Sequence, residues 1–114
     1  MHKNKFISYF DSTKLQLTSH SMGEKFVFFQ KNELLTPLTQ IAIGLLKAGE
    51  VVPVHLHESM EEVFYILSGK GIFSIGDENF NINKNCCIRV PKGFSHSIKS
   101  ENDLQFFYFG VETN

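Results

Sequence analysis

Three histidines and one glutamate are spaced so that they could form a single metal site. His55 and His57 stand two residues apart, Glu62 follows five residues later, and His96 comes further along the chain. Side chains of a β-strand alternate between its two faces, so His55 and His57 would project from one face, about 7 Å apart. Three imidazole nitrogens and one carboxylate oxygen suit Zn, Fe, Mn, Ni or Cu, whereas Ca and Mg prefer all-oxygen sites. The four side chains are therefore candidate ligands for one divalent transition-metal ion per chain.

The spacing around these residues is specific. Residues 49–69 read Gly-x5-His-x-His-x4-Glu-x6-Gly, and residues 91–96 read Pro-x-Gly-x2-His. A chain with five histidines in 114 residues would match the first pattern by chance only roughly 10⁻⁴ times. At these residues the chain resembles the cupin superfamily, whose members are small double-sheeted barrels of the jelly-roll type. The resemblance implies that the metal ligands are His55, His57, Glu62 and His96.

Two positions depart from the second cupin motif, Gly-x5-Pro-x-Gly-x2-His-x3-Asn. Asn85 stands in place of the opening glycine, and Ser100 stands in place of the closing asparagine. Because asparagine tolerates a positive φ better than most residues, we expect Asn85 to make the same turn. Ser100 affects only the last position of the motif, which lies outside the set of direct metal ligands.

Each candidate ligand also has a simpler interpretation. A half-buried histidine usually just completes a hydrogen bond, and Glu62 could be a solvated residue at a strand edge. Glu58 and Glu61 are competing carboxylates. Alternation puts Glu61 on the opposite face from Glu62, and Glu58 falls in the connecting loop, so Glu62 is preferred. His2 and His20 have no motif around them and are expected to face solvent.

The whole sequence predicts an all-β fold, a double-stranded β-helix (the jelly-roll or cupin barrel) with little helix. Short runs of β-branched and aromatic residues are separated by Gly, Asn, Asp and Pro, which is typical of an all-β protein. No 3.6-residue periodicity persists for three turns. Strands are predicted over residues 25–30, 39–47, 52–57, 62–68, 71–75, 79–82, 86–90, 96–99 and 104–111.

Length and charge indicate one globular domain. We expect residues 24–114 to form the barrel and residues 1–23 to be an extension that supplies an edge strand or a short helical turn. Eleven basic against twelve acidic residues leave a net charge of −1 without a block of like charge, so no nucleic-acid partner is expected. No apolar run approaches the about 18 residues of a membrane span, and none resembles a signal peptide. The expected location is cytoplasmic, away from membranes.

Alternation along the strands also assigns the cavity lining. If Glu62 points inward, so do Phe64 and Ile66, and if His96 points inward, so does Ile98. Small-molecule binding sites are largely apolar around a few polar groups. Two further polar candidates have directions that alternation leaves open, namely Gln40 and Tyr108.

The two cysteines, Cys86 and Cys87, are adjacent in the chain. They cannot connect distant strands, and a bond between neighbours would be strained. We expect them to be small apolar residues on opposite faces of one strand. The alternative, a substrate-binding or redox thiol facing the cavity, carries little weight.

Three segments, residues 41–46, 63–67 and 106–109, are apolar on both faces of the predicted strands. A small barrel has one interior to fill, and its outer face normally alternates to polar residues. We therefore expect a second copy of the chain to cover the outer face in a two-fold homodimer. The alternative is that the residues before Lys25 fold across that face.

Four protein ligands leave one or two open positions on a five- or six-coordinate metal, where a small molecule can bind. The sequence carries no Ser-His-Asp order, no phosphate-binding glycine loop and no acid pair for glycoside hydrolysis. The cupin resemblance implies a metal-dependent enzyme of the oxygenase, isomerase or lyase type acting on a small polar molecule, although fold does not fix function. The alternative is a non-catalytic binding or sensing module, in which the metal orients a ligand or stabilises the barrel.

Overall fold

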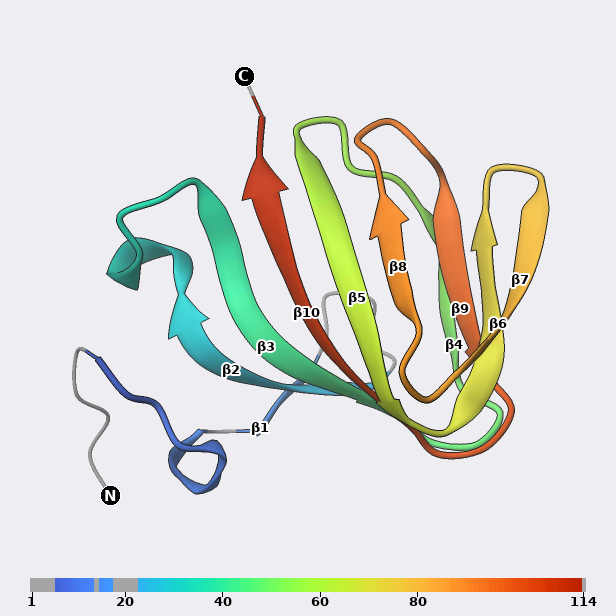
Figure 1. Cartoon of the computed structure of the whole chain (residues 1–114), viewed down its shortest axis with the longest axis horizontal. Coiled ribbons are helices and arrows are strands. Elements are labelled where there is room, and N and C mark those ends of the chain that lie inside the picture. The colour runs from blue at the N-terminus through green and yellow to red at the C-terminus, as the bar shows by residue number, and fades with distance from the viewer. Residues whose placement is uncertain (1–5, 14, 18–22, 114) are drawn as a thin grey trace.

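The computed structural model describes residues 6–13, 15–17 and 23–113, which form two facing antiparallel β-sheets (Figure 1). In this part of the chain the strands are β1 (Leu15–Leu17), β2 (Glu24–Gln30), β3 (Leu38–Leu46), β4 (Val51–His55), β5 (Met60–Ser68), β6 (Lys70–Ile75), β7 (Glu78–Asn83), β8 (Cys87–Val90), β9 (His96–Ser100) and β10 (Leu104–Glu112). The larger sheet has the order β1-β2-β3-β10-β5-β8, and the smaller has the order β4-β9-β6-β7.

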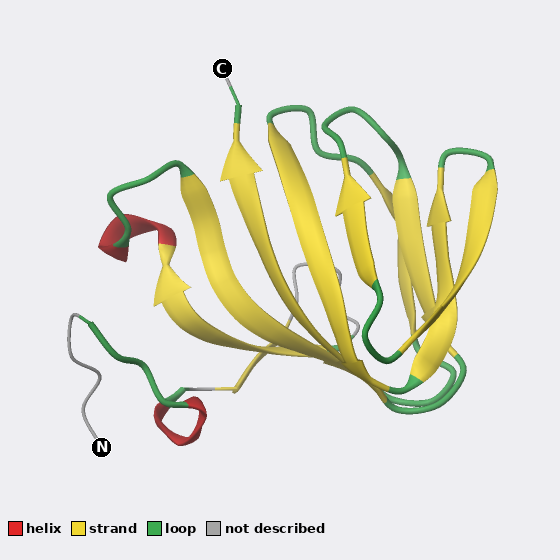
Figure 2. Ribbon diagram, viewed as in Figure 1, coloured by secondary structure: helices red, strands yellow, loops and turns green. Residues whose placement is uncertain are grey.

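This architecture confirms the predicted all-β jelly-roll fold. Every predicted strand is present, with its ends within two residues of the predicted ones. Helix is confined, in the described residues, to two short 3₁₀ turns, η1 (Phe10–Ser12) and η2 (Lys31–Glu33), which both lie beside the larger sheet (Figure 2). No helix in the described ranges has the length and apolar character needed to cross a membrane.

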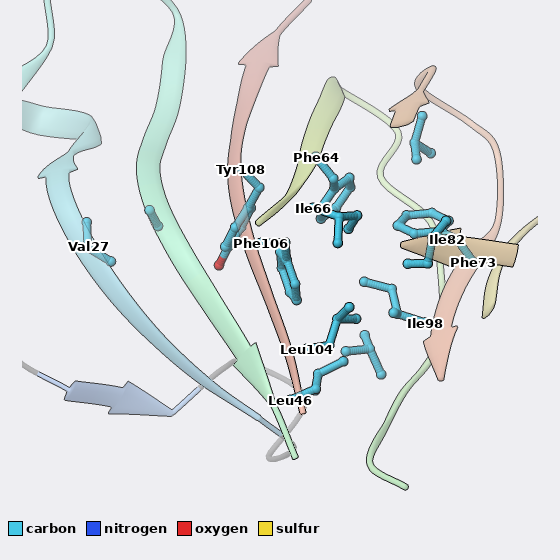
Figure 3. Close-up of a cluster of buried hydrophobic side chains, with 13 residues drawn as sticks. Val27, Leu46, Phe64, Ile66, Phe73, Ile82, Ile98, Leu104, Phe106 and Tyr108 are labelled. Atoms are coloured by element: carbon cyan, nitrogen blue, oxygen red, sulfur yellow. The ribbon is translucent and has the colours of Figure 1, made fainter. Parts of the chain in front are cut away.

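The hydrophobic core fills the space between the two sheets (Figure 3). Along β10 the burial alternates, so that Leu104, Phe106 and Tyr108 face inward while the residues between them are only half-buried. This alternation follows from the two-residue period of a strand. Phe73 of β6 is fully buried, and its ring lies 5.1 Å from that of Phe64 of β5. Aromatic contacts between the sheets therefore hold the two layers together.

Two turns explain positions that the motif comparison singled out. Asn85 has a φ of 71°, which confirms that it makes the left-handed turn where the motif has glycine. Its backbone N–H donates to the Ile66 carbonyl at 2.8 Å. Gly69, the last residue of the first motif, has a φ of 91°, and a β-carbon there would collide with the carbonyl oxygen of Asp103. Glycine is needed at this position for both reasons.

Ser100, the other departure from the motif, has a structural role. Its side chain is buried, and its Oγ lies 2.5 Å from the Lys47 carbonyl oxygen and 3.0 Å from that of Glu50. The backbone carbonyl of Ser100 also accepts a hydrogen bond from the Gly49 N–H at 3.0 Å. Ser100 thereby fixes the turn that leads into β4, and through it the start of the strand that carries His55.

The outer face of the larger sheet carries a continuous apolar row. Residues Phe26, Ile43, Phe107 and Tyr65 are cross-strand partners on four adjacent strands. The ring of Phe10, from the N-terminal segment, lies 4.8 Å from that of Phe26. At the other end of the row, Tyr65 remains 38% exposed. The segment before β2 therefore covers one end of the row and leaves the other end accessible.

Candidate metal centre

The four candidate ligands converge at one end of the space between the sheets. His55 ends β4, His96 begins β9, and the two are cross-strand partners. Glu62 comes from β5 of the opposite sheet, and its side chain is buried. With His57, these residues offer one ligand atom each, and all four atoms lie within 4.8 Å of one another.

The position of His57 differs from the sequence-based expectation. The strand predicted over residues 52–57 ends at His55 as β4, so His57 lies in the following loop. The pairing of β4 with β9 shifts register between Val52 and His55, which ends the regular ladder early. The Gly93 N–H donates to the His57 carbonyl at 2.8 Å. This bond to the turn before β9 holds His57 beside the other ligands without strand geometry.

Backbone carbonyls orient two of the imidazoles. The Nδ1 of His55 lies 2.8 Å from the Pro53 carbonyl oxygen, and the Nδ1 of His96 lies 3.1 Å from that of Phe94. A carbonyl only accepts, so each Nδ1 must carry the proton and donate it. The Nε2 of each neutral ring is then left with a lone pair. Metal-bound histidines usually have their second nitrogen held by such a partner.

The Glu62 carboxylate faces the Nε2 atoms of His96 and His57. Its Oε1 lies 3.2 Å from the Nε2 of His96 and 3.3 Å from the Nε2 of His57. Neutral His96, protonated at Nδ1, would present a lone pair to another lone pair at this distance. A cation shared by the nitrogens and the oxygen, either a proton or a metal ion, removes the repulsion. The donor set and its arrangement therefore fit a metal ion.

The size of the cluster also fits one ion. Ligand atoms about 2.1 Å from a common transition metal lie at most about 4.2 Å apart. The largest separation in the cluster, 4.8 Å, is a few tenths of an ångström wider. Binding of one ion by all four atoms would therefore require the half-buried His55 and His57 side chains to shift by a few tenths of an ångström.

The surroundings of the site favour the neutral form of His55. Burial is the largest effect and lowers the pKa of His55, and the neighbouring His96 and His57 lower the pKa further. Its hydrogen bond to Pro53 and the Glu62 carboxylate act in the opposite direction without cancelling the shift. A ring that resists protonation keeps its lone pair available for a metal.

A cavity of about 190 Å³ opens beside the four ligands. Its wall includes Phe64 and Ile98, as alternation predicted, whereas Ile66 also points inward but belongs to the core. Gln40 and Tyr108, whose directions the sequence left open, both line the cavity. This volume is smaller than the roughly 300–1,000 Å³ of drug-sized sites. The cavity therefore suits a small molecule.

The far wall of the cavity is polar. The Lys25 Nζ donates to Gln40 Oε1 at 3.3 Å, and Gln40 Nε2 donates to the Tyr108 hydroxyl at 3.4 Å. Burial and the Glu62 carboxylate raise the pKa of Tyr108 to about 12, so this hydroxyl keeps its proton at neutral pH. Lys25 was not expected from the sequence. The sequence did contain a signal, because Lys25 stands two residues before Val27 on β2 and so shares its face, and Val27 is buried.

The competing residues lie elsewhere. Glu61 forms an ion pair with Arg89 at 2.6 Å on the opposite face of β5, and Glu58 is exposed in the loop. Cys86 packs against the core and Cys87 is exposed, and both are free thiols outside the cavity wall. The remaining two histidines, His2 and His20, lie outside the described residues.

Comparison with known proteins identifies a family and similar proteins. The cupin domain model matches residues 42–109. An uncharacterized protein of Methanocaldococcus jannaschii is 32% identical over 74 residues, which cover 60% of this chain and 59% of that protein. An oxalate-binding protein of Thermotoga maritima is 35% identical over 63 residues, covering 54% of this chain and 52% of that protein. The chain thus spans between half and three fifths of the length of these curated relatives.

A solved structure extends the likeness to the whole fold. The crystal structure of a predicted oxalate decarboxylase from Thermotoga maritima superposes with a TM-score of 0.83 at 24% sequence identity. The superposition covers 94% of this chain and 99% of that one. It therefore also includes most of the residues that precede the segment that the domain model matches.

Proposed function

Because this chain belongs to the cupin family, we propose that it binds one divalent transition-metal ion and acts on a small polar molecule as a metal-dependent enzyme. The proposed ligands are His55, His57, Glu62 and His96. One observation carries the proposal, namely the convergence of four ligand atoms within 4.8 Å of one another at the wall of a small cavity. Such a combination of ligand-type side chains and a small concave pocket is typical of an active site.

A bound ion would supply Lewis-acid chemistry, and redox chemistry if it is iron, manganese or copper. The residues of this chain would hold the ion and orient the small molecule. Phe64, Ile98 and Phe106 belong to the apolar part of the cavity wall, which lowers the local dielectric and strengthens the polar contacts. A relative of this chain is named an oxalate-binding protein, so oxalate is the first ligand to test.

The second candidate function is a non-catalytic module that binds or senses a small molecule through its metal. The name of that relative describes binding. The two functions differ in what happens to the bound molecule, because a module binds it without converting it.

Metal identity and turnover together separate these functions. Elemental analysis of protein purified without chelators or an affinity tag identifies the ion. Oxygen consumption and nuclear magnetic resonance spectra of incubated oxalate and related acids then report turnover. Metal-dependent conversion supports the enzyme, whereas tightly held zinc with ligand binding and no conversion supports the module. Protein that purifies without any transition metal and takes up none contradicts both.

We expect metal retention to fall below about pH 6, because imidazole must be neutral to bind a metal. The lowered pKa of His55 means that the unfolded chain takes up this proton before the folded chain does. Acid therefore also destabilises the metal-free fold, in the range below the ordinary histidine pKa. Metal content after dialysis at a series of pH values, with melting curves of the metal-free protein, tests both statements. Metal content that is the same at about pH 5 and about pH 7.5 would contradict the assignment.

We also propose that two chains associate through the outer apolar row described above. The exposed end of the row, at Tyr65, offers an apolar surface that a second copy can cover about a two-fold axis. Light scattering at micromolar concentration is expected to give the mass of two chains, and Tyr65→Lys is expected to give the mass of one. Phe80→Lys, at an exposed position of the smaller sheet, is the matched control and should leave the mass unchanged. A wild-type monomer contradicts the proposal.

A further inference from the structure

The polar wall of the cavity is rich in hydrogen-bond donors. Gln40 uses its oxygen to accept from Lys25 and its nitrogen to donate to the Tyr108 hydroxyl oxygen. Lysine carries three donor hydrogens and no acceptor, so Lys25 has donors to spare. The hydroxyl oxygen of Tyr108 accepts from Gln40, and its own proton can be given to another group. A carboxylate, which only accepts when ionised, is the complementary ligand.

The charge of Lys25 points to the same ligand. The residue is half-buried on β2, on the inward face that it shares with Val27. Among the residues that the structure describes, no carboxylate forms an ion pair with it. A partly desolvated cation without a counter-charge is costly. An anion in the cavity would supply that counter-charge.

Sheet register places this polar wall opposite the metal ligands. Gln40, Gly110 and Glu62 are cross-strand partners in one row over β3, β10 and β5. Two strand spacings separate the backbones of Gln40 and Glu62 by about 10 Å. Over Gly110, between them, the Met60 Sδ and the Thr39 Oγ1 lie 2.9 and 2.6 Å from where a β-carbon would stand. Gln40 and Glu62 both line the cavity of about 190 Å³, which has room for a molecule a few atoms long.

We propose that Lys25, Gln40 and Tyr108 form the second anchor of a small dicarboxylate whose first carboxylate binds the metal. Of the residues lining the cavity, Glu62 is the one acid and Lys25 the one aliphatic amine. With a divalent ion and neutral imidazoles, the cavity therefore carries two positive charges in excess, which a dianion neutralises. This inference rests on the proposed metal site and adds the charge of the substrate and the residues that select it.

The test compares each dicarboxylate with its own monoamide, which has the same number of heavy atoms and one negative charge fewer. Zinc-loaded protein is titrated by calorimetry with oxalate, malonate and succinate and with their monoamides. At least one of the three dicarboxylates is expected to bind about tenfold or more tightly than its monoamide, because a charge-assisted contact to Lys25 is lost in the amide. Wild-type protein that binds every acid and its monoamide equally overturns the inference.

The variant Lys25→Met should reduce this ratio to about threefold or less while the bound zinc stays the same, since Lys25 is not a metal ligand. Lys25→Arg keeps the charge and should retain most of the preference. Lys99→Met removes the same charge from an exposed position of β9 and should behave as wild type. An unchanged ratio in Lys25→Met overturns the inference.

Metal content measured in the same preparations keeps the two proposals apart. Zinc-loaded protein without a charge preference overturns the second anchor and leaves the metal site standing. Protein that takes up no zinc, manganese or iron overturns the proposed function, and the second anchor falls with it.

Discussion

Protein carrying His55→Ala or His96→Ala is expected to lose most of its metal while retaining the barrel. Each imidazole supplies one of the four converging ligand atoms. Loss of an outer partner of a metal ligand already lowers affinity about 10–100-fold, so loss of a ligand should lower it at least about 100-fold. Elemental analysis after dialysis measures the loss, and circular dichroism reports the fold. Because His96 is 2% exposed and His55 only half-buried, His96→Ala should also lower the melting temperature more.

Two adjacent glutamates provide the matched control for this experiment. Glu62→Gln removes the carboxylate charge at the site, whereas Glu61→Gln removes the same charge from the opposite face of β5, where Glu61 pairs with Arg89. We expect metal loss in the first variant and wild-type metal content in the second. Equal metal content in wild type, both histidine variants and Glu62→Gln would exclude this cluster as the metal site.

Replacing Phe73 with alanine is expected to lower the free energy of unfolding by about 3–5 kcal/mol. The ring is fully buried between the sheets, in contact with Phe64, and stacks on the His96 imidazole with centroids 6.2 Å apart. Alanine leaves a cavity that the surrounding strands fill only partly. For a domain with a typical stability of about 5–15 kcal/mol, the loss is a large fraction of the total. Denaturant unfolding measures it.

Phe80 supplies the control for the core substitution. It is the cross-strand partner of Phe73 on the edge strand β7, yet it is 43% exposed. Phe80→Ala should therefore cost well under half as much as Phe73→Ala. A similar loss in both variants would mean that burial between the sheets does not set the stability of this fold. Phe73→Leu, which keeps more of the volume, should fall between them.

Much of the fold could be predicted because it depends on local periodicity, whereas the grouping of the four candidate ligands was implied by the resemblance of the motif spacing to the cupins. The order Glu62, Phe64, Ile66 repeats every two residues, and the structure turns all three inward. The same period separated Glu62 from Glu61 without any knowledge of Arg89. The turn at Asn85 followed from the backbone preference of one residue type. Each of these inferences uses only the alternation along one strand or the backbone preference of a single residue.

The features that were missed depend on contacts between strands. His57 departs from strand geometry because of the register shift between β4 and β9. The directions of Gln40 and Tyr108 follow from pairing of β3 with β10, a ladder that also shifts register near Gly110. Lys25 reads as a surface residue because lysine is rarely buried. The pattern within β2 cannot predict that neighbouring strands place Gln40 and Tyr108 beside Lys25.

The ligands come from both layers of the sandwich, since His55 and His96 belong to the smaller sheet and Glu62 belongs to the larger one. An ion bound by all of them would link the two sheets at the open end of the barrel. Parting the layers at that end would then require release of the ion, and release of the ion would free the layers to part. The supply of metal would therefore control how often the two sheets separate at this end of the cavity. When free metal exceeds its dissociation constant about 100-fold, binding adds about 2.7 kcal/mol to the free energy of unfolding.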